Sequence, residues 1–140
     1  MKIKFKLQHI SDNGYHLFCN VKINNIRCIA LVDTGASKSV LNKKFAEIND
    51  FDKIINQNDN LISGINPGQT DISISKIKKL EIGKLSIENF LIGLVDFEHI
   101  NEQYRLLKIK PFDFILGSDI LVETNAIINF KDKTIEINQN

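Results

Sequence analysis

Asp33-Thr34-Gly35 is the stretch of this 140-residue chain whose residue types and spacing point most directly to chemistry. The motif ends an apolar run, residues 26–32, that only Arg27 interrupts. Such a run predicts a strand buried on both faces, which would present the Asp33 carboxylate at a rigid turn. A carboxylate held in this way can move protons in a reaction, whereas the simpler interpretation is a turn residue that caps the following helix. Three residues alone match by chance in about 1 chain in 40 of this length, so the context decides.

The cysteines and histidines do not suggest a second chemical centre. Cys19 and Cys28 are not spaced like a zinc knuckle, and no histidine pair lies near them in the sequence. The histidines are scattered, at His9, His16 and His99. Both cysteines fall inside apolar strand patterns, whereas a nucleophile would be expected at a strand or helix end. We therefore expect two small buried hydrophobic side chains, no favoured disulfide in a reducing compartment, no metal site and no cofactor.

The elements that would position Asp33 are mostly strands. Period-two alternation dominates the chain and predicts an all-β class, mainly β with one or two short helices. Asn24-Asn25 indicates a tight turn, because Asn tolerates positive φ, and this turn would set Val21 opposite Cys28. A helix is predicted over residues 37–48, with a serine cap, while residues 96–110 fit either a short helix or a loop. A last hairpin is predicted around residues 131–133. No linker or repeat divides the chain, so we expect one domain over residues 1–140, built as a barrel-like sandwich.

Three elements of the chain resemble the retropepsin-like aspartic proteases, which are single-domain members of the pepsin-type clan. Leu31-Val32-Asp33-Thr34-Gly35-Ala36-Ser37 is similar to their active-site loop. Later in the chain, apolar residues followed by glycine and a predicted helix are similar to a second family signature, carried by Ile115, Leu116 and Gly117. Between the two, residues 62–68 lie where the family has a glycine-containing flap, whose substrate-binding residues would be Ile62, Ser63, Gly64, Ile65 and Asn66. The resemblance covers most of the domain and implies a retropepsin-like acid-protease barrel.

The same resemblance implies a peptide hydrolase, an aspartic endopeptidase that uses neither a metal nor a covalent intermediate. Two carboxylates share one proton, because like charges held close together cannot both ionise easily. One carboxylate activates a water molecule, and the other hydrogen-bonds the substrate carbonyl. This chain has a single Asp-Thr-Gly, so the pair requires Asp33 from each subunit of a two-fold symmetric homodimer.

The residues around Asp33 take supporting roles by this resemblance. The Thr34 hydroxyl would hydrogen-bond across the two-fold axis, and Gly35 would let substrate backbone approach closely. Ala36 and Ser37 would complete the loop, and the flap over residues 62–68 would close over a peptide and exclude water. Two further carboxylates flank the late glycine. Asp119 is expected in the first turn of a helix and Asp113 at a strand end or in a loop, with neither in the chemistry.

The chain departs from many viral members at Ser37 and Ser118, where those members carry an acidic residue and an arginine. The charged network that ties these loops at the viral dimer interface cannot form in the same way here. In viral members the terminal strands also interleave between subunits, and residues 1–7 and 134–137 have a suitable alternation. We expect the carboxylate chemistry to survive these differences and the interface to differ in detail.

Composition argues against several other classes. Lys and Arg number 18 and Asp and Glu 17, so the net charge of +1 gives no electrostatic signature of nucleic acid or an anionic membrane as partner. No stretch is long and apolar enough to span a bilayer, and the alternating N-terminus lacks a signal-peptide pattern, so a cytoplasmic location is expected. Two alternatives to the homodimeric protease stay open. One is a peptide-binding or scaffolding module that keeps the fold without cleaving, and the other is a monomer whose Asp33 loop is structural.

Overall fold

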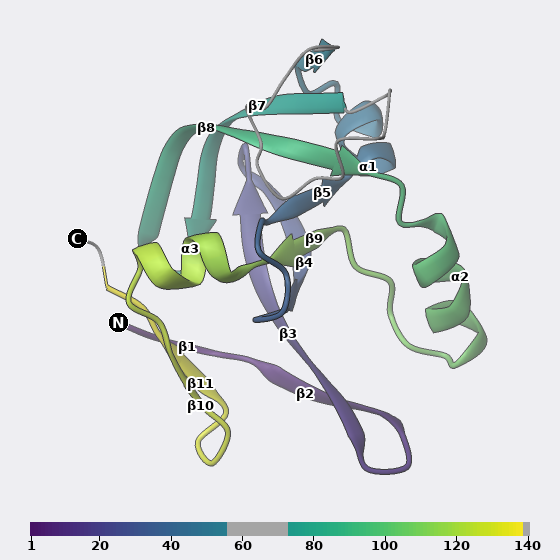
Figure 1. The fold of residues 1–140 in the computed structure, drawn as a ribbon, viewed down its shortest axis with the longest axis vertical. Helices are drawn as coiled ribbons and strands as arrows, with labels where there is room; N and C mark the ends of the chain where they lie inside the picture. Colours follow the sequence, from purple (N-terminus) through teal and green to yellow (C-terminus); the bar gives the residue numbers. More distant parts are fainter. Residues whose placement is uncertain (56–72, 139–140) are drawn as a thin grey trace.

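The computed structural model describes residues 1–55 and 73–138, which form a mostly β protein (Figure 1). The strands are β1 (Lys2–Lys4), β2 (Lys6–Ser11), β3 (Gly14–Ile23), β4 (Ile26–Val32), β5 (Val40–Asn42), β6 (Lys53–Ile55), β7 (Ser73–Ile82), β8 (Leu85–Val95), β9 (Phe114–Leu116), β10 (Ile127–Asn129) and β11 (Thr134–Glu136). The helices are α1 (Lys43–Ile48), α2 (Glu98–Leu106) and α3 (Ser118–Glu123).

The larger sheet contains a closed barrel of six strands. These strands follow the order β3-β4-β9-β5-β8-β7, and the pairing of β3 with β7 closes the ring. β2 and β6 extend the sheet beyond the ring. β9 lies between β4 and β5, parallel to the first and antiparallel to the second. A mostly β barrel confirms the predicted fold class, and the insertion of β9 brings a late segment of the chain against the end of β4.

The turn between β3 and β4 forms where the sequence predicts it. Asn24 and Asn25 both have positive φ, 50° and 67°, as a type I′ turn requires. With this turn Val21 lies opposite Cys28, as expected. Cys19 and Cys28 are buried free thiols. The interpretation of both cysteines as small buried hydrophobic residues is therefore confirmed.

The first helix begins later than the sequence predicts. α1 starts at Lys43, and Asn42 caps it by accepting a hydrogen bond from the Lys44 N–H at 3.3 Å. Val40–Asn42 is strand β5, which pairs with both β8 and β9. The predicted helix over residues 37–48 is therefore wrong in its first half. Pairing with two strands that are distant in the sequence outweighs the local helical pattern.

The two ends of the chain meet in a second, smaller sheet of order β1-β11-β10. Antiparallel pairing sets Lys2 opposite Glu136. Next to this pair, the Ile137 N–H donates to the Met1 carbonyl at 2.9 Å, and the Met1 amine donates to the Ile137 carbonyl at 3.2 Å. Figure 1 shows the hairpin of β10 and β11 running beside β1 and projecting below the barrel. The predicted last hairpin is confirmed, and the terminal strands pair with each other within one chain.

Two apolar clusters on opposite faces of β4 hold these parts together. The main core includes the fully buried residues Ala30, Leu41, Ile77, Leu80 and Phe114. The second cluster consists of Phe18, Phe97, Tyr104 and Phe112, with Ile29 and Leu31 of β4 packed against it. Ala30 packs into the main core, whereas its two neighbours pack against the second cluster. Side chains alternate between the two faces of a strand, which explains this division. Tyr104 of this cluster lies in α2 and anchors the helix. The segment 96–110, for which the sequence allows either a short helix or a loop, therefore contains a helix.

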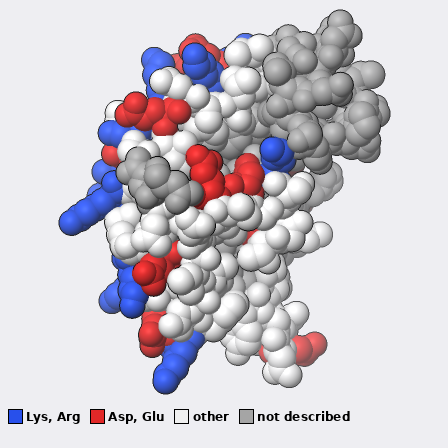
Figure 2. All heavy atoms as spheres, turned by 60° about the vertical axis from the view of Figure 1, so that its left-hand side comes forward, with Lys and Arg blue, Asp and Glu red and all other residues white. Residues whose placement is uncertain are grey.

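Charge is spread over the surface that Figure 2 presents. On this face, Lys and Arg side chains are interspersed with Asp and Glu side chains, and uncharged surface lies between them. This agrees with the net charge of +1. In the part of the chain that the structure describes, no helix has both the length and the apolar character needed to cross a membrane.

Candidate active site

Asp33 lies where a parallel strand pair holds the end of β4. Val32, the last residue of β4, pairs with Leu116 of β9, and the Asp33 N–H donates to the Leu116 carbonyl at 3.0 Å. The strand pairing thus continues one residue past β4 and fixes the backbone of Asp33. The structure therefore brings the first predicted motif together with the second, whose residues Ile115, Leu116 and Gly117 are far away in the sequence.

The loop after Asp33 is a tight turn built on its carboxylate. The Gly35 N–H donates to Asp33 Oδ1 at 2.9 Å, and the Ala36 N–H donates to the Asp33 carbonyl at 3.2 Å. A Cβ atom at position 35 would lie 3.2 Å from Asp33 Oδ1, so glycine leaves room beside the carboxylate. Thr34 and Ser37 are exposed on this loop, whereas Asp33 and Ala36 are half-buried. The backbone holds one carboxylate oxygen and so orients the whole group.

Gly117 allows the two motifs to approach each other closely. A Cβ atom here would lie 2.8 Å from the Ala36 carbonyl oxygen and 2.9 Å from the Lys38 carbonyl carbon. Both are backbone atoms, which cannot rotate away as a side chain can. The Ala36 carbonyl also accepts a hydrogen bond from the Ser118 N–H at 2.8 Å. Packing against the Asp33 loop therefore explains why the second motif carries a glycine at this position.

Sequence reasoning missed one connection in the site, between Asp119 and Ser39. Asp119 lies in the first turn of α3, as predicted, but its Oδ1 accepts hydrogen bonds from the Ser39 N–H at 3.0 Å and the Ser39 hydroxyl at 2.7 Å. The Ser39 Oγ in turn accepts a hydrogen bond from the Gly117 N–H at 2.9 Å. Polar groups shielded from water in this way hold one another strongly. The two residues lie 80 positions apart, so no local pattern could reveal their contact.

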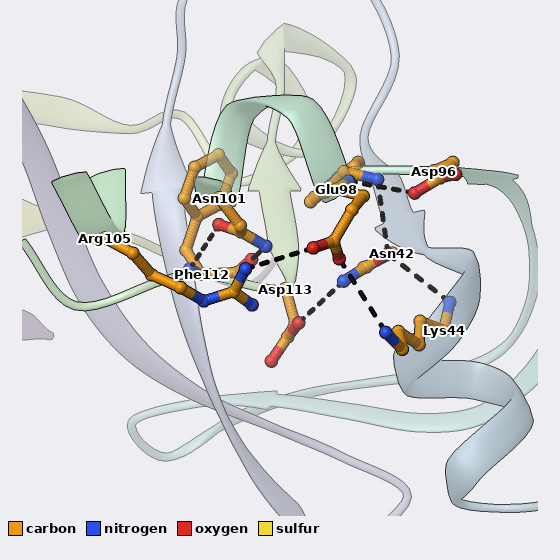
Figure 3. A network of polar contacts seen from close by, with 9 residues as sticks. Asn42, Lys44, Asp96, Glu98, Asn101, Arg105, Phe112 and Asp113 are labelled. Carbon is orange, nitrogen blue, oxygen red and sulfur yellow. Dashed lines mark hydrogen bonds and ion pairs between the residues drawn. The ribbon is translucent and has the colours of Figure 1, made fainter. Parts of the chain in front are cut away.

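A second polar network holds the segment that leads into β9. Asn42 donates to Asp113 twice, from its side chain to Oδ1 at 2.9 Å and from its backbone N–H to the carbonyl at 2.7 Å. The buried Asn101 side chain both donates to and accepts from the backbone of Phe112, at 3.0 and 3.1 Å. Figure 3 shows these contacts beside the exposed ion pairs of Glu98. Asp113 thus has the structural role predicted for it, and α2 is tied to the start of β9.

Asp33 opens onto a groove of about 320 Å³. The lining includes Leu31, Thr34 and His16 on the barrel side and Ile128 and Phe130 from the C-terminal hairpin. Larger hollows of about 570 and 730 Å³ lie elsewhere in the described residues, but Asp33 does not line them. We take the groove at Asp33 as the candidate site because it gives access to the carboxylate. The predicted flap residues Ile62, Ser63, Gly64, Ile65 and Asn66 lie outside the described residues, and their role stays a prediction.

Burial removes the two cysteines from the chemistry. It raises the pKa of the Cys19 thiol from 9.0 to about 12. Burial, with the charge of Asp113 as a smaller cause, also raises the pKa of Cys28. Because the thiolate is the reactive form, two thiols that stay protonated at neutral pH are poor nucleophiles. This leaves the Asp33 loop as the candidate centre that the sequence predicts.

A family model described as gag-polyprotein putative aspartyl protease matches residues 19–123. The chain belongs to this family. The matched span runs from β3 to the end of α3, so this aspartyl protease family model includes both motifs that meet at Asp33. No curated protein matches the chain significantly.

Solved structures of a retropepsin-like aspartic protease, a retroviral protease-like domain and a protease share the fold of this family member. A retropepsin-like aspartic protease from Rickettsia conorii aligns with a TM-score of 0.62 and 18% identity, over 99% of this chain and 91% of its own. The retroviral protease-like domain of Ddi1 from Leishmania major gives a TM-score of 0.57 and 21% identity, over 89% and 90%. EIAV protease, solved with the inhibitor HBY-793, gives 0.51 and 19%, over 86% and 100%. The similarity establishes the retropepsin-like fold, which confirms the predicted barrel.

Proposed function

We propose that this protein is a homodimeric aspartic endopeptidase in which Asp33 from each subunit forms the catalytic pair. The observation that carries the proposal is the anchoring of Asp33. A strand hydrogen bond to Leu116 holds its backbone, and the Gly35 N–H holds one oxygen of its carboxylate. A rigidly placed carboxylate at the mouth of a groove is suited to moving protons to and from a bound reactant. One chain supplies one such group, so a two-fold partner supplies the other.

The proposed reaction needs one proton shared between the two carboxyl groups. The ionised carboxylate takes a proton from a water molecule as the water oxygen attacks the carbonyl carbon of the peptide. The protonated carboxyl group donates its proton to the carbonyl oxygen, which gives a neutral tetrahedral intermediate. Breakdown of this intermediate breaks the carbon–nitrogen bond. The leaving nitrogen takes up a proton from the carboxyl group that had accepted one from water, and the other carboxylate takes a proton from a hydroxyl group of the intermediate. The products are a carboxylic acid and an amine, and the pair again holds one proton.

The groove beside Asp33 favours a peptide chain as substrate. Its walls combine apolar side chains, including Leu31 and Phe130, with the polar groups of Thr34 and His16. Apolar walls with a few polar groups are typical of sites that bind side chains of a peptide and orient its backbone. The sequence of the preferred substrate depends on the second subunit as well, because both copies would line the completed cleft.

Replacement of the carboxylate by an amide tests this function. Asp33→Asn cannot carry the shared proton, and we expect it to reduce cleavage of an unfolded protein substrate by about 10³-fold or more. The exposed Asp52→Asn is a matched control that changes the same charge elsewhere. Both variants should keep the melting temperature and oligomeric state of the parent. Normal cleavage by Asp33→Asn would exclude the mechanism, and tight peptide binding without cleavage by the parent would favour the non-cleaving module.

A further inference from the structure

A hollow of about 330 Å³ lies over β2, β3 and β4, on the sheet face that carries the second apolar cluster. Its walls include Phe18 of β3, Ile29 of β4 and Ile109, which follows α2. Phe18 is buried, whereas the two isoleucines are half-buried and leave apolar surface open to water. Removal of such surface from water is favourable, so the hollow is suited to receive an apolar side chain.

Three lysines line this hollow without an acidic partner. Lys4, Lys6 and Lys110 are all exposed there, and no aspartate or glutamate in the described part of the chain lines the hollow with them. Elsewhere a carboxylate oxygen lies 3.0 Å from Lys79 and 3.1 Å from Arg105, but none of the described residues forms an ion pair with the three lysines. Positive charges gathered in this way raise the local electrostatic potential. The hollow therefore combines apolar walls with a positive charge that attracts an anion.

The positive charge continues into the neighbouring hollow of about 570 Å³, which shares Lys110. Lys22 and Arg27 line this second hollow and lie directly opposite each other in the pairing of β3 with β4. Like charges in such a pair repel each other. The two carboxylates that line the hollow, on Glu81 and Asp113, already contact a lysine and an asparagine side chain. An anion bound along this face would relieve the repulsion.

The smaller hollow adjoins the groove at Asp33. The ring of Phe18 lies 6.4 Å, between centroids, from the ring of His16, which lines that groove. Ile29 precedes Asp33 by four positions along the same strand and its continuation, so their backbones lie about 13 Å apart at 3.3 Å per residue. An extended peptide covers this distance with about four residues. A chain bound at Asp33 can therefore also reach the lysines.

We propose that this lysine-lined hollow is an exosite, a binding site outside the Asp33 groove, for an acidic segment of the protein substrate. An apolar side chain of the segment would enter the hollow, and its carboxylates would contact Lys6 and Lys110. The proposal rests on the proposed function and names the class of substrate. A peptide fits better than a nucleic acid, because Phe5 and Phe18, the aromatic residues of the lining, are only 5% and 7% exposed and offer no open ring for stacking of a base.

Binding of a labelled acidic peptide tests the exosite apart from catalysis. The probe carries one leucine between pairs of glutamates, and fluorescence anisotropy in the Asp33→Asn background gives its dissociation constant without cleavage. We expect Lys6→Glu combined with Lys110→Glu to raise this constant about tenfold or more. Lys76→Glu combined with Lys78→Glu is the matched control, since both lysines are exposed on β7 and line a different hollow. Equal effects of the two double variants would overturn the proposal, provided that circular dichroism shows both to be folded.

Changes in the probe test the chemistry of the ligand. Replacement of its glutamates by glutamines should abolish binding, and replacement of its leucine by serine should weaken binding severalfold. A single-stranded oligonucleotide of the same net charge should bind at least about tenfold more weakly, because it has no side chain for the apolar hollow. An oligonucleotide bound as tightly as the peptide, or a serine probe bound as tightly as the leucine probe, would overturn an acidic, apolar peptide as the occupant.

Cleavage kinetics separate a failure of the exosite from a failure of the protease function. Two substrates share one cleavable segment, and only one of them carries the acidic segment about four residues beyond the cleaved bond. For the parent, the acidic segment should lower KM about tenfold and leave kcat unchanged, and the Lys6→Glu and Lys110→Glu variant should lose this difference but cleave the neutral substrate normally. Equal KM values for the parent would overturn the exosite and leave the protease function standing. A parent that binds the acidic probe but cleaves neither substrate would overturn the function and leave the acidic-peptide site.

Discussion

The carboxylate of Asp119 accepts hydrogen bonds from both the N–H and the hydroxyl of Ser39, which fixes the start of α3 to the loop that follows Asp33. Ser39 is 4% exposed, and its side-chain oxygen also accepts a hydrogen bond from the Gly117 N–H. Ser37 and Ser118 are uncharged, so these two positions cannot form an ion pair between the two motifs. In this chain a buried serine and a carboxylate connect them instead, within one subunit.

Removal of the Ser39 hydroxyl should destabilise the protein. Ser39→Ala leaves the buried Gly117 N–H without a partner and Asp119 with one hydrogen bond fewer, which should lower the free energy of unfolding by about 1–3 kcal/mol. Urea denaturation measures this difference. Ser37→Ala, at an exposed position of the same loop, should stay within about 0.5 kcal/mol of the parent. Equal stability of the two variants would mean that the Ser39 network does not hold the loop.

Addition of one methyl group at Gly117 should impair catalysis more than its size suggests. The new Cβ would meet backbone atoms of Ala36 and Lys38 at less than ordinary contact distance, so the Asp33 loop must shift. A displacement of about 1 Å at a catalytic group can cost about 10²-fold in rate, and overpacking costs about 1–3 kcal/mol of stability. Steady-state cleavage and urea denaturation of Gly117→Ala check both effects. Ser118→Ala is the control, and a Gly117→Ala enzyme as active as this control would contradict the packing account.

The thiol of Cys19 should make stability fall at alkaline pH. In the unfolded chain it releases its proton near pH 9.0, whereas burial raises its pKa in the folded protein to about 12. Above pH 9 the folded state therefore binds more protons than the unfolded state, and stability decreases as pH rises. Between pH 8 and pH 10 this thiol accounts for a loss of about 1.4 kcal/mol. Urea denaturation at both pH values should show a loss smaller by this amount in Cys19→Ala, and identical pH dependence in both proteins would argue against a buried thiol.

Features set by neighbouring residues could be predicted from the sequence, because their causes are local. Asn24 and Asn25 tolerate positive φ, so the β3–β4 turn and the pairing of Val21 with Cys28 follow from them. The apolar run before Asp33 likewise predicts a strand that is buried on both faces, and Ala30 and Leu31 do pack into different clusters. The barrel and the position of Asp33 could be predicted to this extent.

Features set by distant residues could not be predicted in this way. The sequence pattern misplaces the start of α1, because Val40–Asn42 pairs with β8 and β9 and a local helical pattern does not show this pairing. The Ser39–Asp119 contact and the hydrogen bonds of Asn42 to Asp113 are of the same kind. Each depends on which segments the barrel brings together, and that is a property of the whole chain.

Mixed dimers offer the most direct test of a site shared between two subunits. Parent protein and Asp33→Asn protein are mixed at a fixed total concentration, allowed to exchange subunits, and assayed for cleavage. If each site needs Asp33 from both chains, an equal mixture should retain about one quarter of the parent activity, because only dimers of two parent chains are active. Retention of about one half, in proportion to the parent chain present, would mean that one chain forms a complete site and would contradict the shared pair.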